Sequence, residues 1–345
     1  MIRRLGILGG GQLGKMLCEA SKKMDSDITI SVYDASDQAC ARSVCDSFTC
    51  GAFDDVEKVR RFAQDCDIIT YEFENISPMV VRSLDNAVQG SEALRVLQNR
   101  SFEKEFIDSL KLVTCVPHKN VSAGFSFDYP FIVKTDTLGY DGKGQYVIQG
   151  KEDLHHVKRG MIAEQYLTDM KEYSMIIARN VNGQITHYPP FENVHVNQIL
   201  DTTTFARIDR QYERQMFETS ALIAEKLDYY GVLAVEFFLS GETLYVNEAA
   251  PRVHNSGHIT LDAANISQFT LHLYSLLGKD FPSITVDREW CSINVLGQHY
   301  ENVLHSKISG KFYDYGKKST KKDRKVGHIN GALSDMNRLK EARIR

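Results

Sequence analysis

The stretch Pro130-Phe-Ile-Val-Lys-Thr-Asp-Thr-Leu-Gly-Tyr-Asp-Gly-Lys-Gly-Gln-Tyr-Val-Ile148 places a glycine-rich segment between two short apolar runs. The runs from Pro130 to Thr135 and from Tyr146 to Ile148 have the β-branched and aromatic content of strands. We therefore predict a β-hairpin whose loop, Gly139 to Gln145, is flexible and rich in backbone donors.

Lys134 lies on the incoming strand of this hairpin, shortly before the loop. A lysine beside a mobile glycine loop can bind nucleotide phosphates, because the ammonium group supplies a positive charge on one side and the N–H groups of the loop supply hydrogen-bond donors on the other. The segment is not a Walker motif, and a glycine hairpin with solvated lysines is the alternative interpretation. Tyr140 and Asp141 favour the phosphate site, because a turn needs neither an aromatic residue nor a second acid there.

Two glutamates lie on segments that we expect to be neighbouring strands. Glu236 stands within an apolar run, and Glu248 follows twelve residues later, across a turn at Gly241. An antiparallel pair with this turn brings both carboxylates to one face, with Asn247 beside the second. Mg²⁺ prefers hard oxygen ligands and usually takes the rest from phosphates and water, so the pair is a candidate magnesium site. A solvent-facing edge strand is the alternative.

The N-terminus contains another glycine-rich turn. Gly9-Gly-Gly11-Gln-Leu-Gly14 lies between an expected strand, Leu5 to Leu8, and an expected helix, Leu13 to Lys23; Asp34 follows the next strand, Ile28 to Tyr33. This pattern matches the dinucleotide-binding fingerprint, so a nicotinamide-dependent dehydrogenase is one hypothesis. The same backbone N–H groups can approach any phosphate, and a turn that merely packs the helix on the strand is a third possibility.

The succession of elements predicts an α/β N-terminal domain and an α+β centre. A helix to Gln64, capped by Asp54, and a strand from Ile68 to Phe73 continue repeated βαβ units, which indicates a doubly wound parallel sheet over residues 1–95. The elements expected in the centre are a helix from Phe102 to Leu110, strands from Met161 to Tyr166, Tyr173 to Ala178 and Leu233 to Leu239, and a helix from Arg214 to Leu227.

Polar and cationic residues gather in two further segments. Ala250-Pro-Arg-Val-His-Asn-Ser-Gly-His258 supplies closely spaced donors that can bind phosphate or carboxylate. Its two histidines have no nearby cysteines, and we do not interpret them as metal ligands. A lysine-rich stretch is most often a solvated face, whereas the pairs Gly316-Lys317 and Arg324-Lys325 are able to form an anion pocket.

Composition places the chain among ordinary globular proteins. Its 345 residues predict about two to three domains, and 43% hydrophobic with 25% charged residues exclude disordered, collagen-like and coiled-coil chains. The net charge of −4 is too small to indicate a nucleic-acid partner. It divides into −12 before Lys307 and +8 from Lys307 onward. Seven cysteines without a Cys-x-x-Cys pair indicate a reducing compartment, and no apolar run approaches the roughly 20 residues of a membrane span. We therefore predict a cytoplasmic protein without a membrane partner.

In this order, Lys134, the Gly-Tyr-Asp-Gly-Lys-Gly-Gln loop, the paired glutamates and the nonapeptide around His254 make the chain resemble the ATP-grasp superfamily. More narrowly, it resembles the 5-(carboxyamino)imidazole ribonucleotide synthase family, from the Gly9 turn through Tyr71-Glu-Phe-Glu-Asn-Ile to Arg324-Lys-Val-Gly-His. The resemblance implies a doubly wound N-terminal domain without nicotinamide and a central ATP-grasp α+β domain over residues 96–285, whose lid near residues 135–150 closes over ATP. It also implies a small β-rich C-terminal domain over residues 286–345, and a homodimer.

The resemblance further implies a ligase reaction. ATP phosphorylates bicarbonate to carboxyphosphate, the carboxyl group passes to the exocyclic amine of 5-aminoimidazole ribonucleotide, and ADP and phosphate leave. Glu236 and Glu248 would carry Mg²⁺, for which Mn²⁺ is expected to substitute. Catalytic roles are assigned to Lys317 and to Asp141, the latter at the amine proton as a base or a positioning group. The residues implied to hold ATP are Arg100, Lys134, Gly139, Tyr140, Asp141, Gly142, Lys143, Gly144, Gln145, Glu164, Gln165, Tyr166, Leu167, Glu172, His195, Asn247 and Glu248. Those implied to hold the ribonucleotide are Gly11, Gln12, Leu13, Glu74, Tyr140, Arg252, Lys317, Arg324 and Lys325.

The hypotheses differ in how much of the chain they explain. A dehydrogenase accounts for residues 5–34 alone, whereas an ATP-grasp ligase accounts for all the motifs. A non-catalytic regulator on the same fold is disfavoured, because Lys134 and both glutamates are present. A different ATP-grasp carboxylase, or a formate-using transformylase, would differ on the ribonucleotide side, at Glu74, Arg252 and Arg324-Lys325.

Overall fold

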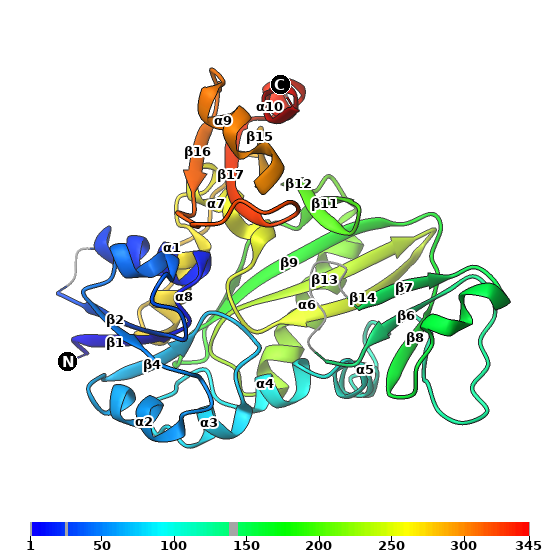
Figure 1. Ribbon diagram of the computed structural model, residues 1–345, viewed down its shortest axis with the longest axis horizontal. Coiled ribbons are helices and arrows are strands. Elements are labelled where there is room, and N and C mark those ends of the chain that lie inside the picture. Colours follow the sequence, from blue (N-terminus) through cyan, green and yellow to red (C-terminus); the bar gives the residue numbers. More distant parts are fainter. Residues whose placement is uncertain (1, 25–26, 138–143, 345) are drawn as a thin grey trace.

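The computed structural model describes residues 2–24, 27–137 and 144–344. In Figure 1 the N-terminal elements, in blue, lie at one end, a small sheet containing β6 to β8 lies at the other, and long strands run between them. The red C-terminal elements stand above the junction with the N-terminal part. Five predicted site residues lie outside the described residues, namely Gly139, Tyr140, Asp141, Gly142 and Lys143.

The N-terminal part contains a parallel sheet in the order β3-β2-β1-β4, as repeated βαβ units require. The helix α2 begins later than predicted: Asp55, and not Asp54, caps it by accepting a hydrogen bond from the Lys58 N–H at 3.1 Å. The strand β4 ends at Tyr71, so Glu72 and Glu74 lie beyond the carboxyl edge of the sheet. The elements are β1 (Arg4–Leu8), α1 (Gln12–Lys22), β2 (Thr29–Asp34), η1 (Cys40–Ser43), β3 (Ser47–Cys50), α2 (Val56–Gln64), β4 (Ile68–Tyr71), α3 (Pro78–Arg82), α4 (Glu92–Leu97) and α5 (Arg100–Ser109).

The predicted hairpin belongs to a small antiparallel sheet in the order β5-β8-β6-β7. Lys134 on β6 pairs with Gln145 on β7, at the end of the hairpin nearest the loop. Buried Phe131, Val133 and Ile148 form the core of this sheet, which explains the apolar runs on both sides of the loop. The elements are β5 (His118–Asn120), β6 (Phe131–Thr135), β7 (Gln145–Ile148), η2 (Lys151–His156) and β8 (Met161–Gln165).

A nine-stranded sheet forms the centre, in the order β14-β13-β9-β11-β12-β15-β17-β16, with β10 paired to β9. The C-terminal strands β15, β17 and β16 continue this sheet, so the C-terminal part is joined to the centre by main-chain hydrogen bonds. The strands are β9 (Lys171–Arg179), β10 (Ile185–His187), β11 (Phe191–Val196), β12 (Ile199–Phe205), β13 (Gly231–Ser240), β14 (Thr243–Ala250), β15 (Trp290–Leu296), β16 (Lys311–Asp314) and β17 (Lys325–Ala332). The helices are α6 (Arg210–Lys226), η3 (Asn255–Ile259), α7 (Thr260–Ala263), α8 (Gln268–Leu276), η4 (Gly297–His299), α9 (Tyr300–His305), η5 (Leu333–Asp335) and α10 (Met336–Ile344). In the described part of the chain, no helix has the length and apolar character that a bilayer crossing requires.

Gln89 is buried where the N-terminal part meets the central sheet. Its Oε1 accepts hydrogen bonds from the Tyr71 N–H at 2.8 Å and from the Thr70 hydroxyl. Its Nε2 donates to the Tyr229 hydroxyl at 3.0 Å and to the Pro251 carbonyl at 3.3 Å. Since Pro251 belongs to the polar nonapeptide, this one amide fixes the edge of the N-terminal sheet relative to that segment.

Gln89→Leu is expected to lower the free energy of unfolding by about 2–4 kcal/mol, because it leaves buried hydrogen-bonding groups of Tyr71 and Pro251 without a partner. Urea denaturation at neutral pH measures the loss. Gln64→Leu, on the exposed side of α2, is the matched control and should change the stability by less than about 0.5 kcal/mol. Equal stability of the two variants would contradict the structural role of Gln89.

Candidate active site

One cavity of about 1140 Å³ lies where the three parts of the fold meet. It is larger than the roughly 300–1,000 Å³ of most small-molecule sites, which suits two ligands side by side. Every predicted site residue that the structure describes lines it, namely Gly11, Gln12, Leu13, Glu74, Arg100, Lys134, Gly144, Gln145, Glu164, Gln165, Tyr166, Leu167, Glu172, His195, Glu236, Asn247, Glu248, Arg252, Lys317, Arg324 and Lys325. Folding therefore brings together motifs that lie up to three hundred residues apart in the sequence.

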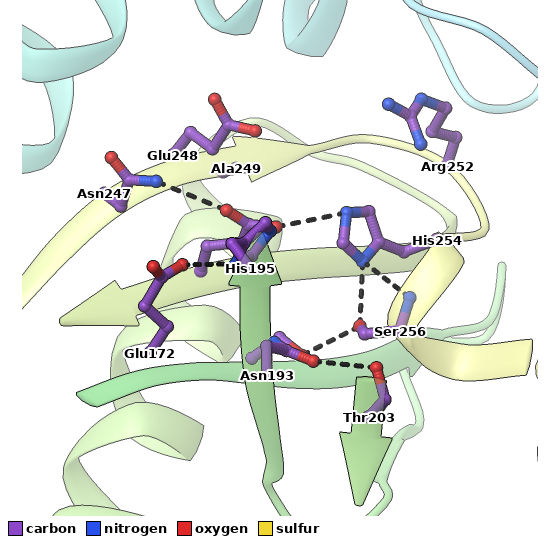
Figure 2. A network of polar contacts seen from close by, with 12 residues as sticks. Glu172, Asn193, His195, Thr203, Asn247, Glu248, Ala249, Arg252, His254 and Ser256 are labelled. Atoms are coloured by element: carbon purple, nitrogen blue, oxygen red, sulfur yellow. Dashed lines mark hydrogen bonds and ion pairs between the residues drawn. The ribbon is translucent and has the colours of Figure 1, made fainter. Parts of the chain in front are cut away.

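The paired glutamates face each other as predicted, since Glu236 on β13 lies opposite Glu248 on β14 in an antiparallel pair. Burial raises the pKa of Glu236 to about 7, and the charge of Glu248 adds to the shift. Desolvation in the cavity would also raise the pKa of Glu248, but the Arg100 guanidinium, 3.1 Å from Glu248 Oε2, and the Lys134 ammonium hold it below its usual value. Asn247, drawn beside Glu248 in Figure 2, donates a hydrogen bond to Glu236 Oε2 at 3.2 Å.

This donor set fits Mg²⁺. Two carboxylates whose mutual repulsion contributes to the raised pKa of Glu236 gain from a divalent cation placed between them. Within the described ranges, no group of three or more His, Cys, Asp or Glu side chains is arranged to hold a metal. Mg²⁺ would therefore take its remaining oxygen ligands from phosphate and water, which is its usual behaviour in nucleotide sites.

Two lysines share the Glu164 carboxylate, and both also contact Asn247 beside the carboxylate pair. Lys134 Nζ lies 2.7 Å from Glu164 Oε2, and Lys104 Nζ forms an ion pair with Oε1 at 3.1 Å. Burial would raise the pKa of Glu164, but the two lysines lower it to about 2. Two ammonium groups on one carboxylate leave a net positive charge in a buried place, which a phosphate group would balance.

Sequence reasoning missed Lys104 and its neighbour Glu103. Lys104 is fully buried, and its signal was its position one helical turn after Arg100, on the same face of α5. Burial raises the pKa of Glu103 to about 8, and its Oε1 accepts a hydrogen bond from the Ala249 N–H at 2.6 Å. These two side chains therefore join α5 to the small sheet and to the strand that carries Glu248.

The other side of the cavity carries the remaining cationic residues. Arg252 Nη2 donates to Glu74 Oε1 at 3.0 Å, and its Nε donates to the second oxygen of the same carboxylate. Burial would raise the pKa of Glu74, but Arg252 lowers it to about 2. Lys317 Nζ donates to the Lys325 carbonyl at 2.7 Å, and burial lowers the pKa of Lys317 to about 8.

Glu72 was also missed, although it stands next to the predicted Glu74 in sequence. Its Oε1 accepts a hydrogen bond from the Gly11 N–H at 2.8 Å, and burial raises its pKa to about 7. Glu72 thus holds the N-terminal glycine turn against the cavity. The signal for it was its place directly after a buried strand, where the carboxyl edge of a parallel sheet collects functional side chains.

Three histidines of the predicted motifs have different surroundings. His195 Nδ1 lies 2.7 Å from Glu172 Oε2, an ion pair drawn in Figure 2, and this carboxylate outweighs the effect of burial and raises the pKa of His195. Burial, with the positive charge of Arg252, lowers the pKa of His254 to about 3, so its imidazole is neutral. His258 lies deeper, with Nδ1 3.2 Å from the Tyr315 hydroxyl.

The N-terminal fingerprint has a local explanation. Both oxygens of Asp34 accept backbone hydrogen bonds, from the Gly10 N–H and the Ser36 N–H, each at 2.7 Å. A Cβ at Gly14 would lie 2.5 Å from the Gly9 carbonyl oxygen, so glycine there permits close packing of the helix on the turn. Asp34 therefore holds the turn through both carboxylate oxygens. In a dehydrogenase, the acidic residue at this place of the fingerprint would instead bind the ribose of the dinucleotide, so the structure disfavours that hypothesis.

Comparison with known proteins assigns the three parts of the chain to three family models. A Ribonucleotide synthetase preATP-grasp domain matches residues 2–98, an ATP-grasp domain matches 113–269, and a Phosphoribosylaminoimidazole carboxylase C-terminal domain matches 291–342. The N5-carboxyaminoimidazole ribonucleotide synthase of Staphylococcus aureus is 38% identical, over 98% of this chain and 94% of the relative. The chain belongs to the N5-carboxyaminoimidazole ribonucleotide synthase family. The ATP-grasp fold class predicted from the sequence is thereby confirmed.

Solved structures of this family support the same conclusion. The N5-carboxyaminoimidazole synthetase from Staphylococcus aureus complexed with ADP superimposes with a TM-score of 0.92 at 36% identity, covering 99% of this chain and 97% of that one. The N5-carboxyaminoimidazole synthase from Aspergillus clavatus, in complex with ADP and 5-aminoimidazole ribonucleotide, gives a TM-score of 0.88 at 26% identity, covering 100% and 99%. The domain boundaries and the roles of individual residues stay predictions.

Proposed function

We propose that this protein is an ATP-dependent ligase that converts 5-aminoimidazole ribonucleotide to N5-carboxyaminoimidazole ribonucleotide. We further propose bicarbonate as the source of the carboxyl group and carboxyphosphate as the intermediate. One observation carries the proposal: the carboxylate pair, Lys134 with Glu164, and the cationic residues around Lys317 line a single cavity. The match of residues 291–342 to the Phosphoribosylaminoimidazole carboxylase C-terminal domain favours this substrate over those of other ATP-grasp carboxylases.

On the nucleotide side, Lys134 and Arg100 would hold the phosphates of ATP with fixed positive charge. Glu236 and Glu248 would hold Mg²⁺, which would supply positive charge against the charge that develops during phosphoryl transfer. Lys134 is already held by Glu164, and Arg100 is held by Glu248. Little reorganisation of these side chains is therefore needed as a bicarbonate oxygen attacks the terminal phosphate.

On the ribonucleotide side, Lys317, Arg324 and Lys325 would bind the 5′-phosphate, with the backbone N–H groups of Gln12 and Leu13 at the start of α1 as further donors. Arg252, already paired with Glu74, would orient the carboxyl group that is transferred. Asp141, outside the described residues, stays our candidate for the amine proton. The homodimer, the cytoplasmic location and the substitution of Mn²⁺ for Mg²⁺ also stay predictions.

The test is phosphate release from ATP with Mg²⁺ and bicarbonate, measured with and without 5-aminoimidazole ribonucleotide. We expect release that requires the ribonucleotide and rises with bicarbonate. Release that is independent of the ribonucleotide would contradict the proposed substrate, and release that is independent of added bicarbonate in carbonate-free buffer would contradict the carboxyl source.

A further inference from the structure

A chain of hydrogen bonds runs beneath the carboxylate pair and leads to His254, whose Nε2 lies 3.3 Å from Glu236 Oε1. Figure 2 shows most of its members, with Asn193 and Thr203 below and His254 above. The four residues below the histidine are at most 5% exposed, and none of them lines the cavity. The chain is formed by Thr203, Asn193, Ser174, Ser256 and His254.

The direction of this chain is fixed at its upper end by the backbone. The Ser256 N–H, which can only donate, points at His254 Nδ1 at 3.3 Å, so this ring nitrogen is an acceptor. The Ser256 hydroxyl, 2.8 Å from the same nitrogen, must then donate to it. Since the only proton of that hydroxyl is used, the Ser174 hydroxyl donates to Ser256 Oγ at 2.8 Å.

The same reasoning passes down to β12. Ser174 Oγ accepts from Asn193 Nδ2 at 3.0 Å, which orients the amide. Asn193 Oδ1 then faces Thr203 and accepts from its hydroxyl at 3.0 Å. Each group therefore donates toward the cavity, and Asn193 accepts and donates through different atoms.

The consequence appears at Glu236. A neutral imidazole carries one proton, and because Nδ1 of His254 accepts, that proton is on Nε2, 3.3 Å from Glu236 Oε1. The main chain of His254 is held as well, since Gln268 accepts from its N–H at 2.8 Å and donates to its carbonyl at 2.6 Å. Asn247 donates to Oε2, so each oxygen of Glu236 has one nitrogen close beside it and keeps lone pairs for a cation.

We propose that Ser256, through its backbone N–H and its hydroxyl, is a positioning residue that keeps His254 in the Nε2–H tautomer and so presents Glu236 as a metal ligand, while Ser174 and Asn193 orient that hydroxyl. The opposite tautomer would place a nitrogen lone pair against the carboxylate and turn it away. Groups that orient a metal ligand in this way typically change metal affinity by about 10–100-fold. The inference rests on the proposed function, because that function includes the role of Glu236 toward Mg²⁺.

The first measurement is the ¹⁵N NMR spectrum of the histidine side chains in the metal-free protein, with the His254 signal assigned by its loss in His254→Gln. We expect a neutral ring with a protonated Nε2. A wild-type ring protonated on Nδ1, or on both nitrogens at neutral pH, would overturn the inference without any variant. This result does not depend on activity, so failure of ribonucleotide-dependent phosphate release would contradict the proposed function alone.

The second measurement compares Asn193→Asp and Ser256→Ala with Thr204→Val. The alanine has no hydroxyl, and the aspartate has no N–H, so that Ser174 can donate to the aspartate in place of Ser256. Because both variants weaken the hold of the Ser256 hydroxyl on Nδ1 and keep the Ser256 N–H, they should populate the Nδ1–H tautomer in part and weaken Mn²⁺ binding in the presence of ADP, by about 10-fold in Ser256→Ala and by less in Asn193→Asp. Thr204 neighbours Thr203 on β12 with its side chain on the opposite face, so its variant should change neither. An unchanged tautomer in both test variants, or a changed tautomer with unchanged Mn²⁺ affinity, would overturn the proposal.

Discussion

Glu248→Gln is expected to abolish ribonucleotide-dependent phosphate release, with kcat lower by about 10³-fold or more, while the chain folds normally. The substitution removes one of the two carboxylates that would hold Mg²⁺, and metal stabilisation of a developing charge is worth several kcal/mol, or about tenfold for each 1.4 kcal/mol. It also removes the negative charge that contributes to the raised pKa of Glu236, so that pKa should fall. Fold retention is expected because the Glu248 side chain is 38% exposed and faces the cavity, away from the apolar core.

The matched control is Glu242→Gln, which lies in the exposed turn of the same β13–β14 hairpin. Both proteins are compared in phosphate release over a range of Mg²⁺ concentrations, with the midpoint of thermal unfolding as the measure of folding. Glu242→Gln should behave as the wild type. Near-wild-type activity of Glu248→Gln at limiting Mg²⁺ would remove Glu248 from the metal site.

The parts of the site that the sequence predicted are those that local pattern determines. The apolar runs on both sides of the Gly139 loop pair as a hairpin, which places Lys134 at the end of the hairpin nearest the loop. The short turn at Gly241 likewise fixes the register of β13 and β14 as far as the pair Phe237–Val246, and a β-bulge at Asn247 then places Glu248 opposite Glu236. In each case a few residues close in sequence settle the geometry.

The parts that were missed depend on partners far away in sequence. Lys104 alone is typical of a solvated helix face, and it becomes a buried ion-pair residue only because Glu164 arrives from the small sheet. Glu103 likewise needs the Ala249 N–H of β14. The periodicity of a single sequence does not reveal contacts between segments that are distant in sequence. A charged residue is therefore expected at the surface, because burying it is costly unless a partner is in place.

The N-terminal turn shows a pattern with more than one meaning. Gly9, Gly14 and Asp34 match a dinucleotide fingerprint because a helix packed tightly on a strand needs glycine, and a tight turn needs an acceptor for its N–H groups. The glycines and the acceptor are required for the turn itself, whether or not a phosphate ligand binds above it. The hydrogen bonds that Asp34 accepts from the Gly10 and Ser36 N–H groups separate the interpretations.

Lys317→Ala is expected to lower kcat/KM for the ribonucleotide by about 10²-fold, because a hydrogen bond to a charged group is worth about 1.5–3 kcal/mol. The KM for ATP should change little, since Lys134, Arg100 and the carboxylate pair are untouched. Lys318→Ala is the matched control, because Lys318 is the exposed neighbour and does not line the cavity. Equal losses for both substrates, or no loss for the ribonucleotide, would return Lys317 to a structural or solvated role.

The pH dependence separates the charge of Lys317 from its bulk. Burial lowers its pKa to about 8, so it is a cation below that pH and loses its proton, with its attraction for a phosphate, as the pH rises through 8. In the wild type, kcat/KM for the ribonucleotide, which reports the free enzyme, should therefore fall above pH 8. Cys40, Glu72, Arg324 and Lys325 are the charged or titratable neighbours, and Glu72, with a pKa of about 7, would act on the acidic side. Lys317→Arg keeps a permanent charge and should lose the alkaline fall while retaining any acidic one. If the alkaline fall persists in Lys317→Arg, another group titrates there, and the cation at position 317 is not what binds the phosphate.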